Sequence, residues 1–134
     1  MNLSISGDVS LSPVPENLKN NYYITVKHRN SIETTSADPV SFAEPDIMYD
    51  FSTSASKAYG NNEKSVQGTY VIYGGDENQD GLVDSSDMID LDNAASSFTV
   101  GYLVTDINGD GLVDSSDMIL IDNNAGDFVR TILP

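Results

Sequence analysis

The feature that most constrains this chain is an internal repeat in its second half. Residues 76–95 align with residues 106–125 at an offset of 30 positions, and 15 of the 20 aligned positions are identical. The match extends to Phe98 and Phe128. A repeat of this kind indicates two copies of one structural unit. Because it begins directly after Gly74-Gly75, we divide the chain into a segment of residues 1–75 and a module of residues 76–134.

Each repeat opens with a twelve-residue acidic loop, residues 76–87 (loop 1) and 106–117 (loop 2). Calcium takes about six to eight oxygen ligands, and a loop can supply them from side chains at positions 1, 3, 5, 9 and 12 and from the carbonyl at position 7. The sequence therefore predicts two Ca²⁺ ions, one in each loop. The expected ligands are Asp76, Asn78, Asp80, the Leu82 carbonyl, Asp84 and Asp87, and then Asp106, Asn108, Asp110, the Leu112 carbonyl, Asp114 and Asp117.

The remaining loop positions support the same interpretation. Position 6 is Gly81 in loop 1 and Gly111 in loop 2, and glycine suits the sharp turn that such a loop needs there. Position 8 is a β-branched residue in both loops, so we expect Val83 and Val113 to pair with each other. Aspartate at position 9 is a good N-cap, which predicts a helix leaving each loop.

A simpler alternative is that each Asp-Gly pair marks a tight turn and the other acids are solvated. That reading explains one Asp-Gly pair, but it does not explain four carboxylates and one asparagine recurring in ligand register. One departure from the usual EF-hand pattern remains, because position 12 is Asp and not Glu.

The paired pattern D-x-N-x-D-G-x-V-D-S-S-D, followed by a short apolar stretch, resembles the dockerin repeat of secreted bacterial multi-domain proteins. The resemblance covers residues 76 to about 129 and implies a half EF-hand, a calcium loop with only its exiting helix, for which Asp at position 12 is normal. In agreement, Thr69–Tyr73 has the composition of a strand and not of an entering helix. The resemblance also implies docking onto a cohesin-type partner through loop positions 10 and 11, which are Ser85, Ser86, Ser115 and Ser116.

The first 75 residues predict short strands. Tyr22–His28 has the clearest alternation of apolar and polar residues. Further strands are expected at 3–5, 9–11, Pro39–Phe42, Ile47–Phe51 and Thr69–Tyr73, with breaks at Pro13–Asn21 and Tyr59–Gly68. We therefore expect an all-β, sandwich-like segment that is incomplete at its N-terminal edge, followed by the small α module. The segment is similar to β segments that precede such repeats in large bacterial surface proteins.

The charge of the chain excludes several partners. The net charge is −15, and it divides into −3 for residues 1–75 (eight acids, five bases) and −12 for residues 76–134 (thirteen acids against Arg130). Nucleic acid and anionic membranes are therefore not expected partners. The chain has no cysteine, which excludes disulfide bonds and thiolate metal sites. It also has no apolar run of about 20 residues, the length of a membrane span. Since its N-terminus lacks a basic start and an apolar core, we expect a piece of a longer, already processed chain.

The expected function is a non-catalytic, monomeric calcium-binding module of a larger secreted or cell-surface bacterial protein, with the metal serving folding and stability. No catalytic motif is found, and the lone His28 is expected to be structural. Two alternatives stay open. The module could bind a cohesin-like protein, or take the β segment of its own chain as its partner. The β segment, which holds six of the seven tyrosines, could instead bind carbohydrate.

Overall fold

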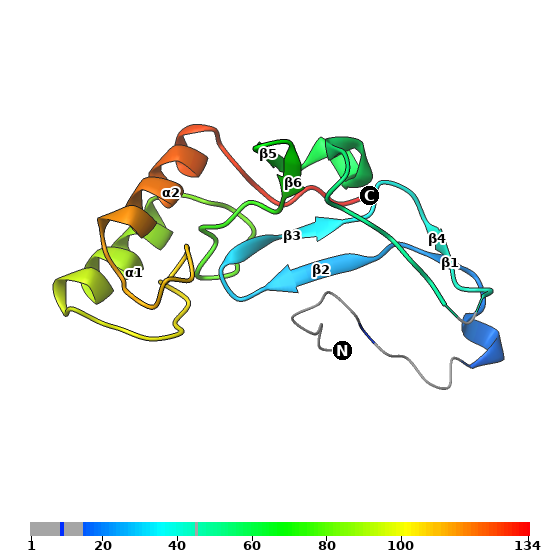
Figure 1. The fold of residues 1–134 in the computed structure, drawn as a ribbon, viewed down its shortest axis with the longest axis horizontal. Helices are drawn as coiled ribbons and strands as arrows, with labels where there is room; N and C mark the ends of the chain where they lie inside the picture. Colours follow the sequence, from blue (N-terminus) through cyan, green and yellow to red (C-terminus); the bar gives the residue numbers. More distant parts are fainter. Residues whose placement is uncertain (1–8, 10–14, 45) are drawn as a thin grey trace.

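The computed structural model describes residues 9, 15–44 and 46–134. Short strands and 3-10 helices come first along the chain, and two longer α-helices follow (Figure 1). This order confirms the expected mixed fold class. The strand expected at 3–5 lies outside the described residues, as does the strand expected at 9–11 apart from Val9. Among the described residues, no helix has the length and apolar character needed to cross a bilayer.

The described strands form three separate two-stranded antiparallel sheets. Their pairings are β1 (Asn21–Tyr22) with β4 (Val40–Ser41), β2 (Thr25–His28) with β3 (Ser31–Thr35), and β5 (Lys64–Val66) with β6 (Thr69–Val71). The expected β-sandwich is therefore not confirmed. Strands this short, interrupted by turns rich in Ser, Pro and Gly, do not assemble into the two broad sheets that a sandwich requires.

The strands agree with the sequence in part. The strand expected at Tyr22–His28 is divided between β1 and β2, and those expected at Pro39–Phe42 and Thr69–Tyr73 are shortened to β4 and β6. Residues Ile47–Phe51 form no strand. There the Tyr49 ring packs edge-on against Phe51, with 4.8 Å between ring centroids, and its hydroxyl donates to a backbone carbonyl. Side-chain contacts hold this segment in place without strand pairing.

Two strands were not expected from the sequence. The strand β3 is the most buried of all, although its sequence Ser-Ile-Glu-Thr-Thr contains one aliphatic residue, Ile32. Burial of Thr34 and Thr35 gives no signal in a hydrophobic pattern. The strand β5 lies inside the expected break Tyr59–Gly68. It pairs with β6 across a tight turn, in which Gln67 and Gly68 both have positive φ (52° and 88°).

Among the described residues there are three single-turn 3-10 helices. η1 (Glu16–Leu18) precedes β1, and η2 (Ala55–Lys57) and η3 (Tyr59–Asn61) lie between β4 and β5. Gly60 in η3 has a φ of +68°, a conformation that favours glycine. A β-carbon added at Gly60 would lie 2.9 Å from Cγ2 of Ile132 in the C-terminal tail. A glycine is therefore needed at this position for its backbone and for the close approach of the tail.

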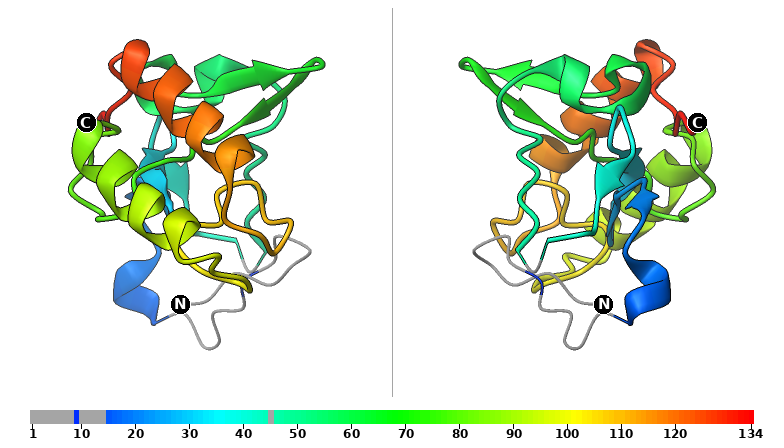
Figure 2. Two further views of the ribbon diagram at one scale, coloured as in Figure 1. Left: turned by 90° about the vertical axis from the view of Figure 1, so that its left-hand side faces the viewer. Right: turned by 90° about the vertical axis from the view of Figure 1, so that its right-hand side faces the viewer.

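The two α-helices begin where the loop pattern predicts. In α1 (Ser85–Ser96), the N-cap Asp84 accepts a hydrogen bond from the backbone, and the carboxylate of Asp87 accepts one from the Asp84 N–H in return. The same reciprocal capping box, anchored on Asp114, begins α2 (Ser115–Gly126). The two helices pack side by side at one end of the molecule (Figures 1 and 2). The helix predicted to leave each loop is confirmed.

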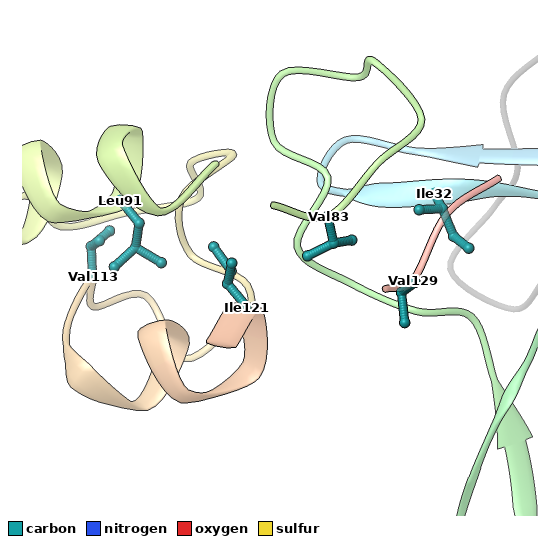
Figure 3. Packing of buried hydrophobic residues seen from close by; sticks show 6 residues of the cluster. All are labelled: Ile32, Val83, Leu91, Val113, Ile121 and Val129. Carbon is teal, nitrogen blue, oxygen red and sulfur yellow. The ribbon is translucent and has the colours of Figure 1, made fainter. Parts of the chain in front are cut away.

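One hydrophobic core joins both parts of the chain (Figure 3). Its fully or nearly fully buried members come from β3, from position 8 of both loops, from both helices and from the tail: Ile32, Val83, Leu91, Val113, Ile121 and Val129. The β2–β3 hairpin is also joined by backbone hydrogen bonds to the chain that leads into loop 1. The Ile32 N–H donates to the Tyr73 carbonyl (3.1 Å), and the Gly75 N–H donates to the Asn30 carbonyl (2.7 Å).

The C-terminal tail lies between loop 1 and the β segment. The Val129 carbonyl accepts a hydrogen bond from the Val83 N–H (3.0 Å), and the Arg130 carbonyl accepts one from the Asn62 amide (2.8 Å). Together with the contact of Ile132 at Gly60, these bonds extend the shared core across the boundary at residue 75.

Candidate metal centre

Both loops have nearly the same backbone conformation. Gly81 and Gly111, at position 6, have φ values of +88° and +86°. Both values lie in the positive-φ region that residues other than glycine rarely adopt, as the sequence predicts for the sharp turn. Most of the hydrogen bonds described below also recur at equivalent positions in the two loops, and one bond to the position-1 carboxylate differs.

The first residue of each loop is buried beneath the loop's own backbone. Asp76 is 2% exposed and Asp106 is 1% exposed. The two carboxylate oxygens of Asp76 accept hydrogen bonds from the N–H groups of Asp80 and Gly81, both at 3.1 Å. Those of Asp106 accept from the N–H groups at positions 4 and 6, at 2.8 and 3.2 Å. Burial raises the pKa of Asp76, and the neighbouring carboxylates of Asp87 and Asp80 add to this increase.

Positions 3 and 5 form short turns at the exposed rim of the loop. The Asn78 side-chain oxygen accepts a hydrogen bond from the Asp80 N–H (2.8 Å), and the Asp80 carboxylate accepts one from the Leu82 N–H (2.9 Å). The equivalent bonds in loop 2, at Asn108 and Asp110, are 2.7 and 2.8 Å long. Both positions are exposed, and one oxygen of each accepts a hydrogen bond from the backbone of its own loop.

Position 12 ties the two ends of each loop together. Asp87 and Asp117 are both fully buried. One oxygen of Asp87 accepts hydrogen bonds from the N–H groups at positions 2 and 3, and the other accepts from the Asp84 N–H (3.0 Å). The bonds around Asp117 are the same. The shorter Asp side chain thus reaches the start of its own loop.

Position 9 carries a carboxylate that caps the following helix, half-buried at Asp84 and exposed at Asp114. The Ser86 hydroxyl and N–H both donate to one oxygen of Asp84 at 2.7 Å, and these bonds hold the pKa of Asp84 below its usual range. Ser116 lowers the pKa of Asp114 in the same way. Both serine hydroxyls also accept a hydrogen bond from the asparagine at position 3. The exposed Ser86 and Ser116 are therefore engaged within their own loops.

The expected pairing of the two position-8 valines is wrong. The Val83 N–H donates to the Val129 carbonyl (3.0 Å), and the Val113 N–H donates to the Thr99 carbonyl (3.2 Å). Each loop is therefore held by the segment that follows the helix of the other repeat. Isolated bridges between Leu82 and Arg130, and between Val100 and Leu112, extend this exchange. Val83 and Val113 are both buried in the core.

The donors in each loop fit calcium in their chemistry. All are carboxylate, amide or carbonyl oxygens, which suit a hard cation. Within the described part of the chain, however, no group of three or more His, Cys, Asp or Glu side chains is placed to hold a metal ion. In both loops the carboxylates are instead directed to backbone N–H groups. The donor chemistry and the turn at position 6 therefore match the prediction, whereas a convergent set of carboxylates is not seen.

Sequence reasoning missed one buried acid in loop 1. Glu77, at position 2, is 7% exposed, and neither of its carboxylate oxygens has a hydrogen-bond partner among the described residues. Burial raises its pKa to about 8, with further contributions from the carboxylates of Asp87, Asp90 and Asp117. A signal was available in the repeat, because the equivalent residue of loop 2 is the apolar Ile107.

The tyrosines of the β segment contact other rings. Tyr22 packs edge-on against Phe42, and Tyr23 packs edge-on against Tyr59, with 5.4 and 6.2 Å between ring centroids. His28 lies within 3.4 Å of the Ser31 hydroxyl and of the Arg29 guanidinium. These contacts give the rings a packing role, and they neither supply nor exclude a sugar platform.

Comparison of the chain with protein-family models, with curated proteins and with solved structures finds no match. The resemblance to dockerins therefore rests on the sequence pattern of residues 76 to about 129 alone.

Proposed function

We propose that residues 76–134 bind two calcium ions, one in each loop, and that the metal serves folding and stability and not catalysis. One observation carries the proposal. The same hydrogen-bonded frame is built twice around oxygen donors, with the carboxylates at positions 1 and 12 at most 2% exposed. Burying carboxylates is costly unless a positive charge accompanies them.

The charge of the module supports this role. Residues 76–134 carry thirteen acids and a single base, Arg130, so two Ca²⁺ ions would offset four of twelve net negative charges. A site that is occupied at a hundred times its dissociation constant adds about 2.7 kcal/mol of stability. Two such sites together would add about 5 kcal/mol, which is comparable to the whole stability of a small domain.

The residues that would hold each ion are those at positions 1, 3, 5, 7, 9 and 12. When bound, calcium would supply positive charge and link these oxygens. The chain's own part is to fix them: the capping box orients positions 9 and 12, and the glycine at position 6 allows the turn. The proposed setting is a larger secreted or cell-surface bacterial protein, because the two repeats resemble the dockerin repeats of such proteins.

Titration calorimetry on metal-free full-length protein tests the proposal. We expect two sites with dissociation constants no weaker than about 10⁻³ M. The variants Asp80→Ala and Asp110→Ala, which change the exposed position-5 residue of one loop each, should each retain one site. Asp92→Ala, which removes an equally exposed acid from α1 outside the loops, should retain both. Wild-type protein that binds one calcium ion, or none, would contradict the proposal.

A further inference from the structure

The turn between β2 and β3, Arg29-Asn30, is hydrogen-bonded to the backbone at the start of loop 2. The Asp106 carbonyl accepts hydrogen bonds from Nη2 of Arg29 (2.8 Å) and from the side-chain amide of Asn30 (2.9 Å). Nε of Arg29 donates to the Leu103 carbonyl (2.8 Å), and its guanidinium lies 3.7 Å from the centre of the Tyr102 ring. Asn30 is 1% exposed. The turn therefore holds the backbone at and just before the first residue of the loop.

In loop 1, the equivalent carbonyl, that of Asp76, accepts a hydrogen bond from a side chain of the loop itself. Its position-4 residue, Gln79, donates from its side-chain amide to the Asp76 carbonyl (2.8 Å). Position 4 of loop 2 is Gly109, which has no side chain to offer. The side chains of Arg29 and Asn30 thus provide to loop 2, from the β segment, the hydrogen bond that Gln79 provides to loop 1.

The peptide unit held by this turn also contacts position 12 of loop 2. The peptide group is planar, so fixing its carbonyl fixes its N–H as well. The carbonyl of the 106–107 peptide is held by Arg29 and Asn30, and its N–H, from Ile107, donates to Asp117 at 2.8 Å. One rigid unit therefore connects the β2–β3 turn with the residues at positions 1 and 12 of loop 2.

We propose that Arg29 and Asn30 are positioning residues of loop 2, and that calcium binding in this loop is coupled to docking of the β2–β3 turn. The inference rests on the proposed calcium binding. Charge alone would give the opposite effect: a guanidinium close to the loop repels a cation, so its removal would strengthen binding. A positioning role requires that removal of Arg29 weakens binding in loop 2. The sign of the change decides between the two.

Calcium titrations of the full chain, monitored by NMR, test the proposal for each loop separately. The N–H groups of Gly81 and Gly111 donate to the position-1 carboxylates of loops 1 and 2, so each reports on its own loop. The variants are Arg29→Gln, which removes the charge, and Arg29→Lys, which keeps the charge but loses the planar fork that reaches two carbonyls. Arg130→Gln is the charge-matched control, because it removes a positive charge on the side of loop 1 and leaves the turn intact.

Both Arg29 variants should weaken calcium binding at Gly111 by about tenfold or more and change binding at Gly81 less. Asn30→Ala should act in the same direction, and it supplies the test together with Arg29→Lys should Arg29→Gln not fold. Unchanged or tighter binding at Gly111 in Arg29→Gln, or wild-type binding in Arg29→Lys, would overturn the positioning role while leaving calcium binding intact. Absence of any calcium-dependent shift at Gly81 and Gly111 in wild-type protein, up to about 10 mM, would overturn both proposals.

Discussion

Glu63, the residue immediately before β5, carries a buried carboxyl group outside the calcium loops. It is 5% exposed, and neither oxygen has a hydrogen-bond partner among the described residues. Burial raises the pKa of Glu63 to about 7, with a smaller contribution from the carboxylate of Asp50. The folded protein therefore keeps a proton that the unfolded chain releases above the ordinary pKa of 4.5. Stability should fall as pH rises from about 4.5 to about 7, and the cost should be constant above that range.

Replacing Glu63 by glutamine tests this cost. The variant should be more stable than wild type at pH 8, by about 1 to 3 kcal/mol, because it removes a buried charge. At pH 5 the two proteins should differ little, since Glu63 is then largely protonated in the folded protein. Urea unfolding of both proteins in saturating calcium at the two pH values measures the difference. An equal difference at both pH values would show that charge is not the cause.

At the residue scale, the sequence predicts the turn at position 6 and the helix cap at position 9, because the geometry of both is local to twelve consecutive residues. It does not predict the partners of the position-8 valines or the hydrogen bonds from backbone N–H groups to the carboxylates of positions 1 and 12. The hydrogen bonds from Arg29 and Asn30 to Asp106 span 77 and 76 positions, and no local pattern encodes them. The burial of Glu77 is an intermediate case. Loop 1 alone does not indicate it, but the apolar Ile107 at the equivalent position of loop 2 does.

At the element scale, the helices are predicted more reliably than the strands. Each helix has a beginning that its capping box defines in the sequence. The strand β3, in contrast, buries Ser and Thr side chains, and its polar composition is that of a loop. Both repeats also end alike. Phe98 and Phe128 follow their helices with φ values of 52° and 56°, and both side chains are more than four-fifths exposed. The two repeats thus also share a positive φ at the phenylalanine that follows each helix, which the sequence alone does not predict.

The glycine in η3 provides a test of how the tail contacts this element. Gly60→Ala should destabilise the protein by about 2 to 3 kcal/mol, because it combines an unfavourable φ with a clash against Ile132. Gly68→Ala is the matched control, since it has a positive φ of 88° but no atom within 4 Å of the added carbon. It should cost about 1 kcal/mol. Thermal unfolding of both variants gives the comparison, and equal losses would contradict the close approach of the tail.

At the scale of the whole molecule, the β segment and the repeat module share one hydrophobic core. Ile32 from β3 shares the core with Val83 and Val129, and the tail returns from α2 to the β segment. The short Gly74-Gly75 connection is consistent with this arrangement. Because these contacts are non-local, no sequence pattern identifies them, and the structure shows that the tail contacts η3 and loop 1.

Removal of the tail measures what these contacts contribute. Deleting residues 128–134 should lower the melting temperature of the calcium-loaded protein by several degrees, because Val129 leaves the core and Ile132 loses its contact at Gly60. Deleting only Leu133 and Pro134, which are exposed, should change it by much less. Equal melting temperatures for wild type and the long deletion would show that the two parts do not support each other.

Hydrogen exchange of the full chain, with saturating calcium and with excess chelator, tests the central claim most directly. If calcium holds the two loops in their folded conformation, chelation should abolish protection in the loops, in α1 and α2 and in the tail. The loss within residues 15–75 should be smaller and greatest at the β2–β3 turn, which contacts loop 2. Equal protection of residues 76–134 in both conditions would contradict a structural role for calcium.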